Sequence, residues 1–317
     1  MTVFHVVSVS SGKDSDETLR QALARFPRER VIAAFCDTGN EHDLAYQHLD
    51  YLETRHGIKI VRLRADFSNE ILAKRLFIAR DVRTGRDGKG RRLRWSNKAK
   101  RRALAALHPS GNPFLDLCMW KGRFPSRKAQ FCTQELKTAM LVQYQQELVE
   151  AGHRVVSWQG VRRDESLNRR YAKKFERINP RTYAYRPIVD WSAPMVFASI
   201  AAHGLKSNPL YTLGMTRVGC MPCINVAKPD LREISARWPE HINRIDDWER
   251  RVGDCSKRGY STFMTDANDA KDRRDIFARL NIRSRVEWSK TTRGGKQYDL
   301  LIEDEPKACS SAYGLCE

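Results

Sequence analysis

Long apolar runs are missing from this chain. No run reaches the roughly 18 residues that a membrane-spanning helix needs, and the N-terminus lacks the charged-then-apolar pattern of a signal peptide. Internal repeats and low-complexity tracts are also absent. We therefore expect a soluble, cytoplasmic protein, and its 317 residues are enough to bury a substantial core.

Acidic residues are scarce relative to basic ones. Lysine and arginine number 57 against 38 acidic residues, a formal net charge of +19. Ten of the twenty residues from Arg83 to Arg102 are basic, and only Asp87 opposes them; a second basic stretch runs from Arg162 to Arg186. A solvated surface would also explain a charge run. The net imbalance favours a polyanion partner, DNA or RNA, because clustered cations neutralise phosphates and release counterions.

Strand-like and helix-like patterns alternate through residues 1–200. This order predicts an α/β fold: a mostly parallel sheet with helices on both faces and ligands beyond the carboxyl ends of the strands. The expected strands are Phe4–Val9, Val31–Cys36, Lys59–Leu63 and Val155–Gln159, and the expected helices are 16–25, 42–55, 69–79 and 134–151.

Two parts are expected along the chain. Residues 1–226 would form a nucleotide-binding domain, and residues 227–317 a mainly helical extension with a cysteine-containing tail. Amphipathic helices are predicted near 230–251 and 268–279. Residues 84–113 show no clear periodicity, so the basic insertion at about 83–113 is expected to be a loop or lid.

A phosphate-binding loop is predicted directly after the first strand. The apolar run ending at Val9 is followed by Ser10, Ser11, Gly12, Lys13, Asp14 and Ser15. A small, glycine-containing turn that opens a helix presents backbone N–H groups and the positive end of the helix dipole to an anion. A Walker loop has an earlier glycine and a Gly-Lys-Ser/Thr ending, and this loop has neither its spacing nor its ending.

The loop resembles the Ser-Gly-Gly-x-Asp-Ser loop of the PP-loop ATP pyrophosphatases, with Ser11 in place of the first glycine. Further segments in sequence order make residues 1–226 similar to the phosphoadenosine phosphosulfate (PAPS) reductase family of the adenine nucleotide α-hydrolase-like superfamily. These segments are Val31–Glu41, Gln159–Ser166, Tyr185–Ser192, Asn208–Tyr211 and Gly219–Cys223.

The resemblance implies an enzyme that binds ATP and cleaves it between its α- and β-phosphates. Lys13, Asp14, Ser15 and Asp37 would be catalytic, and magnesium is the expected counterion of the pyrophosphate. Arg162 and Arg163 suit phosphate because a guanidinium donates two parallel hydrogen bonds. The residues expected to bind the nucleotide are Ser10, Ser11, Gly12, Lys13, Ser15, Asp37, Thr38, Gly160, Arg162 and Arg163.

Three functions remain open at this point. The first is ATP-dependent sulfur transfer to a nucleic acid, with a sulfur donor such as a cysteine desulfurase. The second is a sulfonucleotide (PAPS or APS) reductase, but the Glu-Cys-Gly-Leu-His segment that carries the nucleophile of such reductases is missing; Gly314-Leu315-Cys316-Glu317 is only reminiscent of it. The third is a non-catalytic nucleic-acid-binding protein. The charge and the Lys-Asp-Ser ending of the loop favour the first.

The eight cysteines favour metal or sulfur chemistry over disulfides in a cytoplasmic protein. Cys220 and Cys223 have the spacing at which two thiolates bind one metal or cluster. Cys132 precedes a predicted helix, where the dipole stabilises a thiolate. Cys36 and Cys118 lie in apolar sequence and are expected to be core cysteines.

In the cluster-containing reductases, cysteines before a comparable helix join a Cys-x-x-Cys pair to hold a 4Fe-4S cluster. The resemblance therefore implies that Cys132, Cys220 and Cys223 are ligands here. Those relatives have adjacent cysteines at the first position, whereas Thr133 follows Cys132. The fourth ligand is expected to be Cys316, with Cys309 or an open iron site as alternatives, and zinc is the alternative metal.

Overall fold

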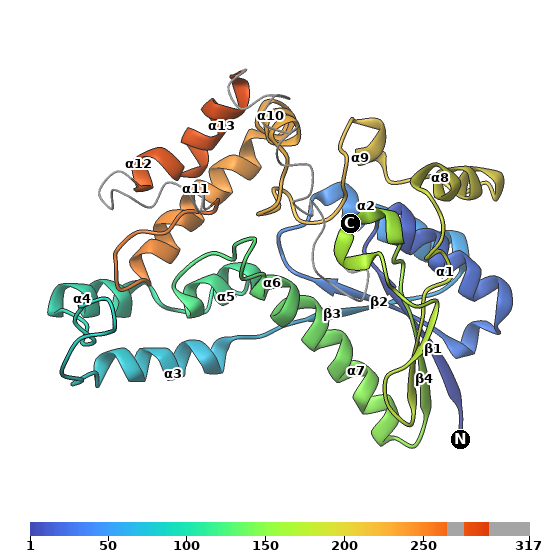
Figure 1. The fold of residues 1–317 in the computed structure, drawn as a ribbon, viewed down its shortest axis with the longest axis horizontal. Coiled ribbons are helices and arrows are strands. Elements are labelled where there is room, and N and C mark those ends of the chain that lie inside the picture. The colour runs from blue at the N-terminus through green and yellow to red at the C-terminus, as the bar shows by residue number, and fades with distance from the viewer. Residues whose placement is uncertain (265–275, 292–317) are drawn as a thin grey trace. The chain divides into compact units, whose positions relative to one another are not determined.

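The structure is a computed structural model that describes residues 1–264 and 276–291 (Figure 1). These residues divide into two compact units. Unit 1 comprises Met1–Ala65 and Gln130–Asn225, and unit 2 comprises Asp66–Ala129 with the described part of Val226–Arg293. The sequence predicts a single boundary at residue 226. In the structure, unit 2 also includes Asp66–Ala129, which lies within the predicted N-terminal domain.

A six-stranded sheet forms the centre of unit 1, in the order β3-β2-β1-β4-β6-β5. All neighbouring strands are parallel except β5, which is antiparallel to β6. The central strand β1 is apolar along most of its length and buried, as is typical of a strand covered on both faces. The strands are β1 Val3–Val9, β2 Val31–Asp37, β3 Ile60–Arg64, β4 Arg154–Trp158, β5 Phe175–Arg177 and β6 Thr182–Tyr185.

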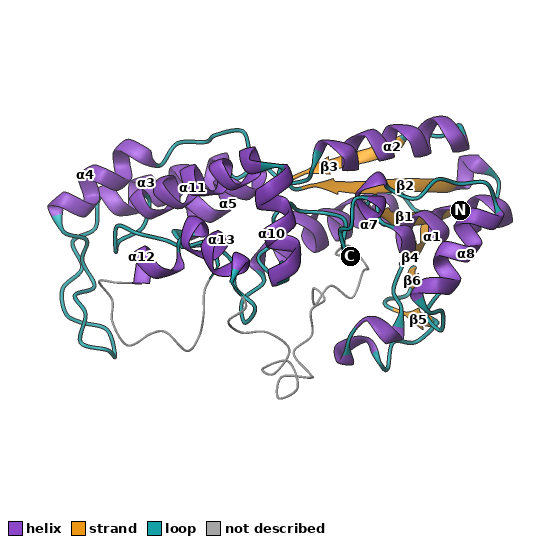
Figure 2. Ribbon diagram, turned by 90° about the horizontal axis from the view of Figure 1, so that it is seen from above, coloured by secondary structure: helices purple, strands orange, loops and turns teal. Residues whose placement is uncertain are grey.

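Helices cover both faces of this sheet (Figure 2). Leu19 of α1 and Leu49 of α2 pack with Val7 on one face, and Leu141 of α7 packs with Val6 on the other. The α/β fold predicted from the sequence is confirmed. The helical segments of unit 1 are α1 Lys13–Arg25, α2 Asp43–His56, α6 Phe131–Thr133, α7 Ala139–Glu150, α8 Ala193–Ala202, α9 Pro209–Thr212, the π-turn η2 Gln134–Thr138, and the 3-10 turns η1 Arg28–Arg30, η3 Arg163–Glu165 and η4 Leu167–Arg169.

The strand order reverses at β1. The chain proceeds from β1 to β2 and β3 on one side, and β4 then pairs with β1 on the other side. In open parallel sheets, ligands bind outside the carboxyl ends of the strands at such a switch point. The predicted phosphate loop follows β1, and Gly160 follows β4, so the two lie on either side of this point.

Unit 2 is helical. Its core contains Phe114 stacked on Trp248, with ring centroids 5.7 Å apart, and the fully buried Phe263. Its helices are α3 Ser68–Ala79, α4 Asn97–Ala106, α5 Pro113–Lys121, α10 Lys228–Arg237, α11 Pro239–Asp254, α12 Ile276–Leu280 and α13 Ile282–Lys290. No helix in the described ranges is long and apolar enough to cross a membrane.

The C-terminal helical extension predicted from the sequence is confirmed, and one local prediction is wrong. The segment expected to be irregular over residues 84–113 contains α4, whose buried face consists of Ala99 and Ala103. Alanine is only weakly apolar, so alanines among lysines and arginines left the segment polar on average and hid a helix that Ser96 caps by accepting from the Ala99 N–H. Of the helix predicted at 268–279, residues 268–275 lie outside the described residues.

Candidate active site

The loop after β1 is closed by the Ser15 hydroxyl. Ser15 Oγ donates to the carbonyl of Gly12 at 2.8 Å and accepts from the Ser10 N–H at 3.1 Å. Ser10 Oγ also lies 3.2 Å from Ser15 Oγ. All of Ser10 to Ser15 is buried. Ser15 therefore fixes the shape of the loop as well as being a predicted phosphate contact.

Ser11 has features that suit an anion-binding position. Its φ of 63° lies in the left-handed region that favours glycine, the residue that the PP-loop pattern has there. Its hydroxyl is buried and has no hydrogen-bond partner within residues 1–264 and 276–291. Buried polar atoms are normally bonded, so this hydroxyl would gain a partner if a phosphate oxygen entered the loop.

Two buried cations converge on one buried carboxylate. Asp14 lies 3.2 Å from Lys13 Nζ through one oxygen and 2.9 Å from Arg162 Nε through the other. Arg162 also pairs with Asp164. Burial opposes the charged guanidinium, but Asp14 and the acidic residues of η3 outweigh it and raise the pKa of Arg162. Arg162 thus stays charged beside the loop, as a pyrophosphate site requires.

Gly160 lies in close contact with the loop backbone. A Cβ atom at residue 160 would be 2.9 Å from the carbonyl carbon and oxygen of Asp14 and 3.0 Å from the Ser15 nitrogen. These three atoms belong to the backbone and cannot rotate away. Only glycine therefore permits β4 to end this close to the loop.

The Asn208–Tyr211 segment also contacts the loop. Asn208 Nδ2 donates to the Ser11 carbonyl at 3.2 Å, and the Lys13 N–H donates to the Tyr211 hydroxyl at 3.2 Å. Lys13 Nζ lies 5.7 Å from the centre of the Tyr211 ring and 5.9 Å from that of Phe197. In the sequence this segment is recognisable only as a family signature, and nothing in its pattern assigns its side chains to the loop.

A buried acid–histidine pair lies directly after the loop. His48 Nε2 on α2 is 2.7 Å from Asp16 Oδ2, and both side chains are almost fully buried. Burial raises the pKa of Asp16 above its ordinary value, although the His48 contact opposes the shift. In the sequence His48 is recognisable only as part of a helical pattern, so this pair was missed.

Asp37 and Thr38 are held in the turn after β2. Asp37 Oδ1 accepts from the Gly39 N–H at 2.9 Å and from the Tyr46 hydroxyl at 2.8 Å. Thr38 Oγ1 donates to Glu41 Oε1 at 2.7 Å. Burial, with Glu41 and Asp37 close by, raises the pKa of Tyr46, so that hydroxyl remains a donor. Hydrogen bonds therefore hold the turn next to the loop of the neighbouring strand.

The Cys-x-x-Cys turn is bonded to this same turn. The Asn40 carbonyl accepts from the Met221 N–H at 2.8 Å, and Asn40 Nδ2 donates to the Pro222 carbonyl at 3.0 Å. Cys220 Sγ lies 3.4 Å from Thr38 Oγ1. Burial raises the pKa of the Cys220 thiol well above its ordinary value, although the nearby Lys137 opposes this. The sequence did not suggest that Cys220 and Thr38 are neighbours.

The described residues do not by themselves form a metal site. No group of three or more His, Cys, Asp or Glu side chains in residues 1–264 and 276–291 is placed to hold a metal ion. Cys220 and Cys223 lie together on one turn, and Cys132 lies on α6. Cys309 and Cys316 fall outside the described residues, so the four-cysteine cluster stays a prediction. Cys36 and Cys118 are buried, as expected of core cysteines.

Arg163 has partners outside the loop. Its guanidinium pairs with Asp190 and donates to the Ala172 carbonyl at 2.9 and 3.0 Å. Other arginines of the second basic stretch are also engaged: Arg169 is buried against Glu165, and Arg186 is buried 3.1 Å from Glu176. Part of this stretch therefore stabilises the fold. The nucleotide role of Arg163 stays a prediction.

The mostly parallel sheet, with the Ser10–Ser15 loop at its switch point, has the architecture of the adenine nucleotide α-hydrolase-like superfamily. The phosphoadenosine phosphosulfate reductase domain matches residues 4–226, and the chain therefore belongs to the PAPS reductase family.

Three similar proteins show how the likeness is distributed. An uncharacterized 37.8 kDa protein from the gpa 5' region of Escherichia phage 186 is 44% identical, covering 100% of this chain and 97% of that protein. A Methanocaldococcus jannaschii protein is 25% identical over 74% of this chain but only 39% of its own length. Adenosine 5'-phosphosulfate reductase of Rhizobium meliloti is 34% identical over 25% of this chain and 30% of the enzyme.

Among solved structures, PAPS reductase of Candida auris in a phosphate complex is similar with a TM-score of 0.41 and 12% identity. That likeness covers 70% of this chain and 83% of the yeast protein.

Proposed function

We propose that this protein uses ATP to activate an oxygen of a nucleic acid and then replaces that oxygen with sulfur. The observation that carries the proposal is the loop: Lys13 and Arg162 converge on Asp14, and the buried Ser11 hydroxyl has no hydrogen-bond partner in the part of the chain that the structure describes. This arrangement offers cations and hydrogen-bond donors to the two phosphates that leave as pyrophosphate.

The reaction would proceed in two displacements. The acceptor oxygen attacks the α-phosphorus of ATP, the bond from that phosphorus to the bridging oxygen breaks, and pyrophosphate leaves with the electron pair. Hydrosulfide then attacks the adenylated centre, and AMP leaves with the original acceptor oxygen. Sulfur enters at the sulfide level, so neither step requires an oxidant or a reductant.

Each part of the loop would have a definite role. Lys13 and Arg162 would neutralise charge developing on the leaving pyrophosphate, because fixed cations in a buried site act more strongly than in water. The Ser11 hydroxyl would donate to a phosphate oxygen, and Ser15 would keep the loop closed. Asp37, with its carboxylate at the neighbouring strand end, would contact the nucleotide or its ion. Magnesium, when bound, would neutralise further charge on the pyrophosphate.

Nucleic acid is the proposed acceptor because the charge of +19 exceeds what a small sulfonucleotide would need. The sequence identity to adenosine 5'-phosphosulfate reductases, over 25% of this chain, supports the second candidate, reduction of a sulfonucleotide. The Glu-Cys-Gly-Leu-His segment expected of such a reductase is absent from the sequence.

We also propose that Cys132, Cys220 and Cys223 hold an iron–sulfur cluster together with a tail cysteine, with Cys316 preferred to Cys309. The support is the Cys-x-x-Cys spacing on a turn that is hydrogen bonded to Asn40, next to Asp37 and Thr38. Zinc remains the alternative metal. The reaction above does not depend on which group binds there.

Product analysis tests the proposed function. ATP labelled at the α-phosphate should yield AMP and pyrophosphate when nucleic acid and sulfide are present. Lys13→Ala should weaken nucleotide binding roughly tenfold or more, because a hydrogen bond to a charged group contributes about 1.5–3 kcal/mol. Lys59→Ala is the control, since the Lys59 side chain is 91% exposed.

The products separate the candidates. ADP with inorganic phosphate would refute cleavage between the α- and β-phosphates. Sulfite released from a sulfonucleotide without ATP would favour the reductase. Nucleic-acid binding without either reaction would favour the non-catalytic protein.

A further inference from the structure

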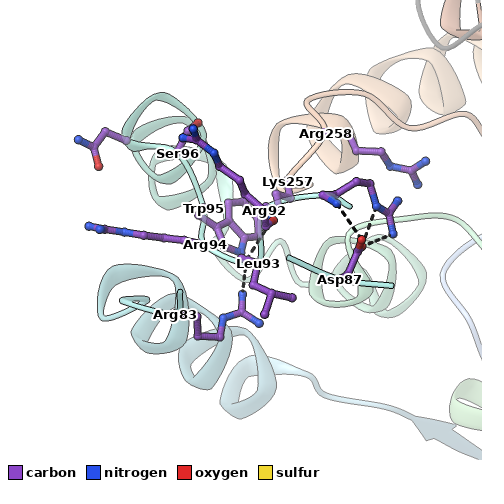
Figure 3. Close-up of a pocket in the computed structure, with 11 residues that line it drawn as sticks. Arg83, Asp87, Arg92, Leu93, Arg94, Trp95, Ser96, Lys257 and Arg258 are labelled. Atoms are coloured by element: carbon purple, nitrogen blue, oxygen red, sulfur yellow. Dashed lines mark hydrogen bonds and ion pairs between the residues drawn. The ribbon is translucent and has the colours of Figure 1, made fainter. Parts of the chain in front are cut away.

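Unit 2 contains an open basic groove. Its cavity volume is about 980 Å³. The groove is lined mostly by cationic and polar side chains (Figure 3). The lining residues are Arg83, Asp87, Arg91, Arg92, Leu93, Arg94, Trp95, Ser96, Asn97, Lys257 and Arg258.

Two distant segments of the chain build this basic groove. Residues 83–93 fold back on themselves, with the Leu93 N–H donating to the Gly85 carbonyl at 3.1 Å. Lys257, on the segment after α11, donates to the Leu93 carbonyl at 2.9 Å and also to that of Arg92. This contact places Arg258 beside the 83–97 segment. The sequence indicated only the first of these two segments.

The positive charge of the groove is only partly neutralised. Asp87 is the one carboxylate in its lining, and it is occupied by Arg91 at 2.7 Å. Arg83 is bonded to Asp81, which lies outside the lining, at 2.8 Å. Arg92, Arg94 and Arg258 are exposed. These three make no ion pair with the residues that the structure describes.

The first turn of α4 adds to the positive electrostatic potential of the groove. Ser96 and Asn97, at the start of this helix, both line the groove. The first turn contains no acidic residue, and Lys98 lies in it. Helix N-termini are normally stabilised by negative charge, and in the described residues no carboxylate of the first turn offsets the positive end of α4.

We propose that the basic groove binds the phosphodiester backbone of the nucleic acid that the proposed reaction uses as its acceptor. This inference rests on the proposed function for the identity of the acceptor. The cations line an open groove instead of an enclosed pocket, which suits a row of phosphates better than one small anion. Trp95 is only 7% exposed, so it anchors the wall and offers no face for base stacking. The groove therefore binds without reading sequence.

Salt dependence of binding tests this proposal. The triple variant Arg92→Ala, Arg94→Ala, Arg258→Ala removes three exposed cations from the groove. Its control is Arg55→Ala, Arg154→Ala, Arg232→Ala, which removes the same charge from three exposed arginines that do not line the groove. Labelled duplex DNA, single-stranded DNA and transfer RNA serve as probes over a range of salt concentrations. Thermal unfolding checks that both variants fold.

The plot of log affinity against log salt has a negative slope, of about 0.9 per phosphate contact on a duplex and about 0.7 on a single strand. Loss of three contacts in the groove variant should make this slope shallower by roughly two to three. Equal slopes and affinities for the two triple variants would overturn the proposal. So would loss of binding to inorganic phosphate or a phosphorylated peptide with nucleic-acid binding unchanged.

Failure here is distinct from failure of the proposed function. AMP and pyrophosphate formation with no effect of the groove variant on nucleic-acid binding would reject the groove alone. Groove-dependent binding of nucleic acid without ATP cleavage would reject the reaction and retain the groove as a binding surface.

Discussion

Replacing Gly160 by alanine should displace the phosphate loop. The added Cβ would lie 2.9 Å from two backbone atoms of Asp14 and 3.0 Å from the Ser15 nitrogen, so either β4 or the loop must move. Overpacking of this kind costs about 1–3 kcal/mol. If the loop yields, the same free energy appears as nucleotide affinity that is roughly 5- to 150-fold weaker, since each 1.4 kcal/mol is tenfold.

Isothermal titration with a non-cleavable ATP analogue measures the affinity, and urea unfolding measures the stability of the same variant. Gly88→Ala is the matched control: no atom lies within 4 Å of its added Cβ, and its φ is not positive. Wild-type affinity together with wild-type stability in Gly160→Ala would refute the close approach of β4 to the loop.

Two further predictions concern a buried acid and the cysteines. Burial raises the pKa of Glu249 from 4.5 to about 7 in the folded protein. The protonated Glu249 side chain therefore contributes to the free energy of unfolding in full below pH 4.5, and this contribution, about 3 kcal/mol, is lost as the pH rises to about 7. Glu249→Gln should remove this pH dependence of the free energy of unfolding, measured in urea. Glu240→Gln, at an exposed position of α11, should keep it. Parallel pH profiles for wild type and Glu249→Gln would show that Glu249 is not the titrating group. After anaerobic purification, iron and labile-sulfide analysis should show a cluster that Cys132→Ser, Cys220→Ser and Cys223→Ser each lose and Cys118→Ser keeps. Stoichiometric zinc without iron would refute the cluster.

The sheet of unit 1 was predictable because its central strands are short apolar runs separated by helical patterns. Val3–Val9 and Val31–Asp37 need no tertiary information to be recognised as buried strands. The helix α4 was not predictable from its pattern, because its buried face consists of alanines. Ala99 and Ala103 have helical spacing, but their small side chains do not stand out among the surrounding lysines and arginines.

The candidate site was predictable where the motif is continuous in sequence and was missed where distant segments meet. The loop from Ser10 to Ser15 was identified directly. Tyr211 reaches the Lys13 N–H and Lys257 reaches the Leu93 carbonyl only through the fold. Contacts across such sequence separations leave no spacing that a single sequence can reveal.

Incorporation of radiolabelled sulfide into nucleic acid tests the central claim most directly. The wild-type protein should transfer label to DNA or RNA only when ATP is present, with one AMP formed for each sulfur incorporated, and Lys13→Ala should lower both in parallel. Label that enters without ATP, or AMP that forms with no sulfur in the nucleic acid, would contradict ATP-dependent sulfur transfer.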